Sequence, residues 1–223
     1  MGKGNFFPTS CCILLHCLSS KILLMNISVP TSNNYFLKDN LEKVLDIISN
    51  DGVILFPTDT IWGIGCDACN PVAIERIYNL KKRDRSKPFI LLVDSVDMLR
   101  DYVTQVPPRI ETLLAHHTRP LTVIYDQGKN LPPNAMSAVG SVAIRMVQDP
   151  FCRQLIHAYN RPLVATSANI SDAPFPSTFG EISSEVFQGV DYVFHHRRDD
   201  KTQHEPSVIV KYNEKGDLIF IRE

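Results

Sequence analysis

Blocks of apolar and polar residues alternate along the chain from about Leu37 to the C-terminus. Apolar residues spaced three or four apart predict an amphipathic helix over 41–48, and the turn Asp51-Gly52 leads into an apolar strand over 53–56. By the same criteria, further helices are predicted over 71–80, 107–116, 150–159 and 181–187. Further strands are predicted over 89–93, 121–125, 142–144, 163–165, 192–194, 207–211 and 218–221. This interleaving predicts the α/β class with helices flanking the sheet, and the closely spaced last strands predict a mixed sheet.

Residues 1–24 do not follow this pattern. Lys3 and the apolar stretch 11–15 are faintly like a signal peptide, but polar residues from His16 to Lys21 interrupt the stretch and no clean cleavage site follows. No part of the chain has the roughly 18 consecutive apolar residues that a membrane span needs. We therefore expect 1–24 to be a non-native or disordered extension, Met25 to be the natural initiator and 25–223 to form a single domain.

Composition narrows the classes of function. The 223 residues include 23 Lys+Arg and 24 Asp+Glu, a formal net charge of −1, so the protein as a whole is not a polybasic nucleic-acid binder. Six cysteines, half of them in the first seventeen residues, form no disulfide framework and predict reduced thiols in the cytoplasm. Cys66 and Cys69 form a C-x-x-C without a second ligand pair, so packing is favoured over a metal site.

Four stretches carry more polar residues than a core needs. The first, 56–65, runs from a strand into a loop of hydroxyl residues and then two glycines, and such loops at strand ends often host ligands in α/β sheets. Gly63, Gly65 and Ala68 fit a loose dinucleotide fingerprint, but Gly63 lies too far from the strand and Pro71 follows too soon. An ordinary glycine turn and a ligand loop both fit this stretch.

The second stretch, Lys81 to Pro88, holds five cations in seven residues between a helix and a strand. A run of charged residues is usually a solvated face, but this run is anchored at both ends, by a helix and by a strand, which favours an anion site here.

In the third stretch Arg145 directly follows the strand 142–144, where an unpaired cation is costly, so it is expected to meet a carboxylate from the protein or a ligand. The fourth, 163–171, runs from a strand into Ser167 and Asn169, which suit hydrogen bonding or a capped turn.

Together these residues supply hydroxyls, an amide and many cations, with few carboxylates. Hydrolysis by a carboxylate pair or a catalytic triad is therefore not favoured. The inventory suits a bound anion whose reaction depends on positioning and charge neutralisation, as phosphoryl and nucleotidyl transfer do.

The motif FPTDTIWGIG resembles the opening motif of the YrdC/Sua5 family, the threonylcarbamoyl-AMP synthases. LKKRDRSKPFILLV is similar to the family's K-x-R segment and the strand after it, and RPLTVIY, VAIRM, PLVATSANIS and EPSVIV follow in the family order. The likeness extends from about Leu37 to the C-terminus, and K-x-R with a distant S-x-N is specific as a set. It implies a YrdC-like fold, in which a twisted mixed sheet with flanking helices surrounds a basic concave cavity.

The resemblance also implies a reaction and a site. L-threonine, bicarbonate or CO2, and ATP with Mg2+ would give L-threonylcarbamoyladenylate and pyrophosphate, and a separate t6A-transferring complex would modify adenosine 37 of tRNA. Carried over by position, threonine would be held by Thr58, Arg145, Ser167 and Ser207. ATP would be held by Lys81, Arg83, Asn169, Ser177 and Arg222, with Arg85 and Ser141 as further contacts. Lys81, Arg83, Ser167 and Asn169 would be catalytic, and no protein-held metal is implied.

The chain departs from the family pattern in its details. Unusual residues stand at six positions: Asp59 for Glu, Trp62 for Tyr, Leu92 for His, Asp172 for Gly, Val208 for Thr, and Glu223 where Gly often follows the arginine. They affect the expected threonine pocket and the C-terminal ATP contact.

Two other classes of function stay open at this point. A concave basic surface can bind double-stranded RNA or tRNA by shape without catalysis, although the net charge near zero argues against it. The same domain also occurs inside larger carbamoyltransferases, a reading that the lack of further domains in this sequence disfavours.

Overall fold

A single mixed β-sheet organises the computed structural model, which describes residues 35–202, 205–213 and 217–222. Within those ranges the strands lie in the order β7-β1-β2-β6-β3-β5-β4-β8-β9. Their bounds are β1 Ile54–Phe56, β2 Gly63–Gly65, β3 Ile90–Val93, β4 Leu121–Tyr125, β5 Val142–Met146, β6 Leu163–Ser167, β7 Tyr192–Val193, β8 Val208–Tyr212 and β9 Leu218–Arg222. The pairs β1/β7, β3/β5 and β4/β8 are parallel and the others antiparallel, which confirms the predicted mixed sheet. The predicted extension 1–24 lies outside the described residues.

Six α-helices are interleaved with the strands of the described part. They are α1 Leu41–Ser49, α2 Pro71–Lys81, α3 Val96–Tyr102, α4 Pro108–His116, α5 Pro150–Tyr159 and α6 Ser184–Gln188. The polar residue before a helix often fixes its start: Asn70 Oδ1 accepts hydrogen bonds from the first turn of α2, and Asp149 Oδ1 accepts one from Cys152 N in α5. None of the helices in the described ranges has the length and apolar character to cross a membrane.

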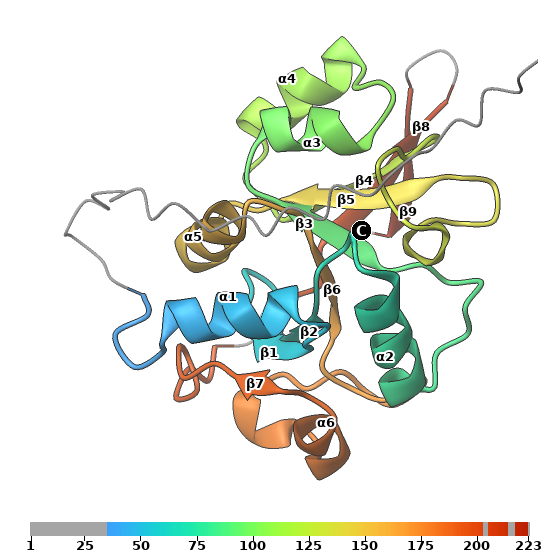
Figure 1. Ribbon diagram of the computed structural model, residues 1–223. Helices are drawn as coiled ribbons and strands as arrows, with labels where there is room; N and C mark the ends of the chain where they lie inside the picture. The colour runs from blue at the N-terminus through green and yellow to red at the C-terminus, as the bar shows by residue number, and fades with distance from the viewer. Residues whose placement is uncertain (1–34, 203–204, 214–216, 223) are drawn as a thin grey trace, which may run out of the picture. The chain divides into compact units, whose positions relative to one another are not determined.

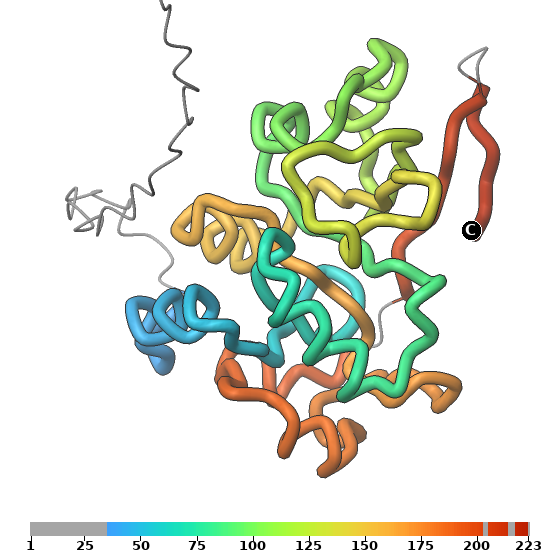
Figure 2. The backbone as a smooth tube through the Cα atoms, turned by 45° about the vertical axis from the view of Figure 1, so that its right-hand side comes forward, coloured from blue at the N-terminus to red at the C-terminus, as the bar shows by residue number. Residues whose placement is uncertain are grey.

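Helices cover both faces of the sheet. Val44 of α1 and Phe151 of α5 belong to one core cluster, whereas Ile74 of α2 and Ile110 of α4 belong to the other. Successive residues of a central strand alternate between the two clusters, as the pleat of a strand requires. Figure 1 shows α1 and α5 on one side of β6 and α2 on the other. Figure 2 shows the β8–β9 hairpin, in red, at one edge of the sheet.

Three local differences from the sequence prediction bear on the site. Gly63–Gly65 is not a turn but the strand β2, and a Cβ on Gly65 would lie 2.4 Å from the Val164 carbonyl oxygen, so only glycine fits there. Arg145 lies inside β5 rather than after the strand, which extends to Met146. The helix α3 was not predicted, because its seven residues are too few to show a clear helical period.

Candidate active site

A row of polar side chains crosses one face of the sheet, on β5, β4 and β9 and at Ser207, which directly precedes β8. Arg145 pairs across the ladder with Thr122, and the Thr122 and Ser207 hydroxyl oxygens lie 2.8 Å apart. Arg222 donates from Nε and Nη2 to the Ser207 carbonyl oxygen at 3.0 and 2.7 Å. Thr122, Arg145 and Ser207 are all buried. Polar groups in a core need hydrogen-bond partners, and Thr122, Ser207 and Arg222 supply partners to one another, so the row forms a connected polar site within the sheet.

Two positive charges meet on this face. Burial and the nearby charge of Arg145 lower the pKa of Arg222. Arg145 itself is only 4% exposed, and its Nη2 lies 3.2 Å from Asp59 Oδ1. The expected carboxylate partner of Arg145 is therefore internal. The Nε atom of Arg145 is buried without a hydrogen-bond partner, so one donor of this guanidinium is not used by the described residues.

The loop between β1 and β2 brings hydroxyls to Arg145. Arg145 Nη1 donates to Thr60 Oγ1 at 3.1 Å, and Thr60 Oγ1 lies 2.9 Å from Thr58 Oγ1. Thr58 Oγ1 in turn donates to the Ile61 carbonyl oxygen at 2.8 Å. Because that carbonyl can only accept, the hydroxyl of Thr60 donates to Thr58, and the bonds run in one direction from Arg145 to the loop backbone. The two threonines are thereby fixed in orientation.

Lys81, the last residue of α2, lies beneath the loop that follows β6. Its Nζ donates to the carbonyl oxygens of Ser167 and Asn169, each at 2.5 Å, and to Asn169 Oδ1 at 3.2 Å. The residue is 1% exposed. Burial, and then the charge of Arg83, lower the pKa of Lys81 to about 7. The three oxygen acceptors match the three hydrogens of an ammonium, so Lys81 holds the S-x-N loop from below.

The S-x-N loop is also bonded within itself. Ser167 Oγ donates to Asn169 Oδ1 at 2.5 Å, and Asn169 Nδ2 donates to the Ala173 carbonyl oxygen at 2.5 Å. Asp172 has φ 67°, in the left-handed region. Asp tolerates this region better than most residues, which explains how it can stand where glycine is usual.

The remaining cations of the 81–88 segment do not converge. Arg83 donates from Nε to the Lys87 carbonyl oxygen at 2.8 Å and lies 5.2 Å from the centre of the Phe89 ring. Lys82 pairs with Glu185, and Arg85 pairs with Glu75 on the exposed side of α2. Three cations of this run thus have protein partners of their own, while the anion site expected for the segment stays a prediction.

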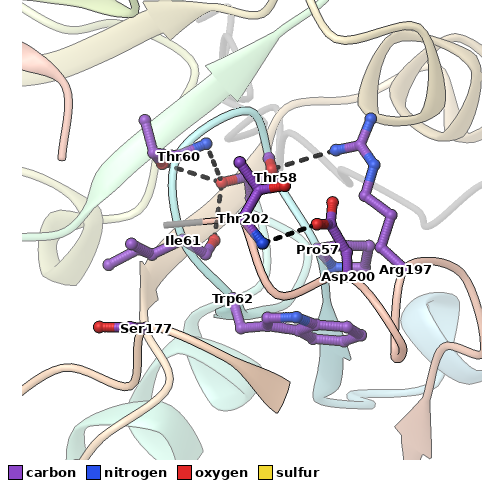
Figure 3. Close-up of a pocket in the computed structure, with 9 residues that line it drawn as sticks. All are labelled: Pro57, Thr58, Thr60, Ile61, Trp62, Ser177, Arg197, Asp200 and Thr202. Carbon is purple, nitrogen blue, oxygen red and sulfur yellow. Dashed lines mark hydrogen bonds between the residues drawn. The ribbon is translucent and has the colours of Figure 1, made fainter. Parts of the chain in front are cut away.

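The structure brings two predicted residues of different roles, one for threonine and one for ATP, into one pocket. Thr58 and Ser177 line it together with Thr60, Trp62 and the segment around Arg197 (Figure 3). A second, separate pocket lies between Arg85 with Ser86 and the loop 133–140, and Ser141 Oγ lies 2.7 Å from Ser137 Oγ at the end of that loop.

Sequence reasoning missed three residues of the site. Thr60 and Thr122 were not selected, because a threonine in a loop or strand has many ordinary roles. Asp59 was noted only as a departure from the family motif. The signal for Thr122 was a buried hydroxyl within the apolar strand 121–125, which a pattern alone does not distinguish from an ordinary β-branched residue.

The fold and site define an α/β domain with a buried, cationic and hydroxyl-rich face. Residues 46–223 match the model of the Sua5/YciO/YrdC family, described as "Telomere recombination", and the chain belongs to this family. The threonylcarbamoyl-AMP synthase of Vibrio parahaemolyticus is 31% identical over 151 residues, which cover 66% of this chain and 82% of that protein. The predicted family is thereby confirmed.

Solved structures agree on the fold. P. abyssi Sua5 complexed with L-threonine has a TM-score of 0.72 at 23% identity, covering 82% of this chain and 53% of that one. This chain thus spans about half the length of that Sua5 protein. E. coli YciO has a TM-score of 0.71 at 22% identity, covering 82% of this chain and 88% of that one. The predicted YrdC-like sheet with flanking helices is confirmed.

Proposed function

We propose that this protein is an L-threonylcarbamoyladenylate synthase. It is then a nucleotidyltransferase that uses L-threonine, bicarbonate or CO2, and ATP with Mg2+, and releases pyrophosphate. The proposal rests on its relatives, which carry the name threonylcarbamoyl-AMP synthase, and on one observation in the site. The buried Arg145 keeps an unused Nε donor beside fixed hydroxyls and a second guanidinium, Arg222.

The threonine carboxylate is the group that this arrangement suits. Among the described residues Arg145 forms its ion pair with one carboxylate, Asp59, and the charge of Arg222 lies nearby, so a bound anion would stabilise the two guanidinium groups. The hydroxyls of Thr60 and Ser207 offer partners of the size and polarity that the threonine side chain needs, and Thr58 holds Thr60 in place. In this proposal Asp59 orients Arg145, and the ligand carboxylate takes the donor that the protein leaves unused.

The chemical step needs electrostatic help rather than a base. The threonine nitrogen adds to CO2 and loses a proton to solvent, and the resulting carbamate is already an anion. One of its oxygens attacks the α-phosphorus of ATP, the bond to the bridging oxygen breaks, and pyrophosphate leaves. Arg83 and the loop held by Lys81 then stabilise charge that grows on the phosphate oxygens. Asn169, Ser177, Arg222, Arg85 and Ser141 complete the proposed ATP contacts.

The fate of the product and the location of the enzyme belong to the same proposal. The adenylate passes to a t6A-transferring complex that acts on adenosine 37 of tRNA, and the reaction takes place in the cytoplasm.

Double-stranded RNA binding without catalysis is the competing class of function. Because Lys82 and Arg85 already pair with glutamates, the exposed side of α2 offers fewer free charges than its sequence suggests. A salt titration separates the two, since RNA affinity falls steeply with salt.

Omission of each substrate in turn tests the proposal. The protein is incubated with ATP, Mg2+, bicarbonate and L-threonine, and pyrophosphate release is measured as each component is left out. Mass spectrometry is expected to find the threonylcarbamoyl adenylate only when bicarbonate is present. An equal yield with serine, or with no amino acid, would reject threonine as the substrate.

A further inference from the structure

The segment after β7 reaches the hydroxyl-bearing loop 57–60 with Arg197. Arg197 Nη1 donates to the Thr58 carbonyl oxygen at 3.2 Å, and Nη2 donates to Asp149 Oδ2 in an ion pair. The Asp149 side chain is 4% exposed and that of Arg197 is 28% exposed. Figure 3 shows the Arg197 guanidinium beside the loop, reaching it from a separate segment.

The backbone of Arg197 shows that this placement is specific. Its φ is 60°, in the left-handed region that side-chain-bearing residues adopt infrequently. The position therefore suits a glycine or an asparagine by local preference, and the ion pair with Asp149 offsets the local cost. Since Asp149 neutralises the guanidinium, Arg197 is suited to hold the protein in shape rather than to attract a phosphate.

A second contact fixes the neighbouring carbonyl of the same loop. Cys152 Sγ donates to the Pro57 carbonyl oxygen at 3.4 Å, and Cys152 N donates to Asp149 Oδ1 at 2.9 Å. The first turn of α5 and Arg197 therefore hold two successive carbonyls of the loop. Two residues further on, Thr60 receives the hydrogen bond from Arg145.

We propose that Arg197 is a positioning residue for the amino-acid subsite, which sets the Thr58 and Thr60 hydroxyls against Arg145 by clamping the loop to Asp149. Arg197 acts through the Thr58 carbonyl and does not touch the substrate. The kinetic part of this inference rests on the proposed function. A loop that moves by about 1 Å can cost a large factor in a reaction that depends on alignment, so a clamp of this kind has a measurable effect.

Arg198 offers a matched control on the same segment. It is the adjacent arginine and donates to the carbonyl oxygens of Phe194 and Val193, with its guanidinium 5.0 Å from the centre of the Phe179 ring. None of these contacts reaches the loop 57–60. Arg197→Ala is expected to raise the threonine KM about tenfold, and to leave the ATP KM and the turnover at saturating substrates unchanged. Arg198→Ala is expected to change none of the three.

A double-mutant cycle tests the route through Asp149. Asp149→Asn keeps an oxygen for the helix cap but removes the charge that pairs with Arg197. If the two residues form one clamp, Asp149→Asn raises the threonine KM as Arg197→Ala does, and the double variant is no worse than either single one. Additive effects, an effect on the ATP KM in place of threonine, or an equal effect of Arg198→Ala would each overturn the proposal.

Hydrogen exchange gives a readout that needs no substrate. Peptides that cover 57–62 are expected to exchange faster in Arg197→Ala than in the parent or in Arg198→Ala, because the loop opens more often. Equal exchange in the three proteins overturns the clamp. If the parent makes no threonine-dependent product, the proposed function fails, while selective exchange in Arg197→Ala still supports the clamp.

Discussion

Replacing Lys81 by methionine separates the stability of the buried lysine from its role in the reaction. Methionine has a similar length and no charge, so Lys81→Met removes the ammonium and keeps most of the volume. The variant leaves the Ser167 and Asn169 carbonyl oxygens without their shared donor. Each unpaired buried acceptor costs about 1–3 kcal/mol, or roughly 2–6 kcal/mol for the two.

Burial of the Lys81 charge contributes to the free energy of unfolding with the opposite sign. Lowering the pKa of Lys81 from 10.5 to about 7 corresponds to roughly 5 kcal/mol of unfavourable burial of the charge. Methionine relieves this cost, so the two terms nearly cancel. We expect the free energy of unfolding in urea to change by no more than about 3 kcal/mol. The folded variant then reports on the reaction itself.

Turnover is expected to fall while the fold persists. Without Lys81 the S-x-N loop loses the donor that fixes it, and under the proposed function a positive charge of the ATP site is lost with it. At saturating ATP, pyrophosphate release should drop by about 10²-fold, as for other electrostatic stabilisers. Lys82→Met is the control, because Lys82 is exposed and pairs only at the surface with Glu185. Unchanged turnover in Lys81→Met with a raised ATP KM would refute the reasoning. The 81–88 segment would then contribute to binding only and not to the chemical step.

Three further predictions concern separate contacts. Arg145→Ala should raise the threonine KM roughly ten- to hundredfold, because a lost charged hydrogen bond costs about 1.5–3 kcal/mol; a change confined to the ATP KM would contradict this. Arg83→Lys should lower turnover, since a point charge cannot replace a planar fork held over Phe89, and unaltered kinetics would remove Arg83 from the site. His196 stacks 4.8 Å from Phe151 with a buried Nε2, and burial lowers its pKa, so the folded state binds fewer protons than the unfolded one. Stability should therefore fall as pH drops below about 6.5, and less so in His196→Phe, as thermal melts at pH 7.5 and 5.5 would show; equal losses in both proteins would exclude His196.

Much of the fold could be predicted from local patterns, and the exceptions have physical causes. Helix α5 appears at the predicted bounds because Asp149 and Pro150 start it clearly. The strand β2 could not be predicted from Gly-Ile-Gly, because its reason lies in a close approach of Val164 from a strand about 100 residues away. Pattern reasoning finds local elements and misses those that a distant neighbour imposes.

In the candidate site, too, residues with a local signal could be predicted, whereas contacts between distant segments could not. Arg145 and Ser167 stood out because charged and polar residues adjoin apolar strands, and the resemblance added the residues of the K-x-R and S-x-N motifs. The separate partners of the cations after Lys81 could not be predicted, because Glu75 and Glu185 reach Arg85 and Lys82 only in the folded protein. Likewise the contact of Arg197 with Thr58 joins segments that nothing in the sequence connects.

The order of the strands has a consequence for how the protein is made. In the sheet β2 pairs with β6, and β4 pairs with β8, so the neighbours of early strands are translated long afterwards. Arg145 cannot meet Arg222 until β9 has left the ribosome, and contacts between such distant segments slow folding. The face that carries Arg145 and Arg222 is therefore assembled only after β9 has joined the sheet, and a ligand that binds this face would stabilise the assembled sheet.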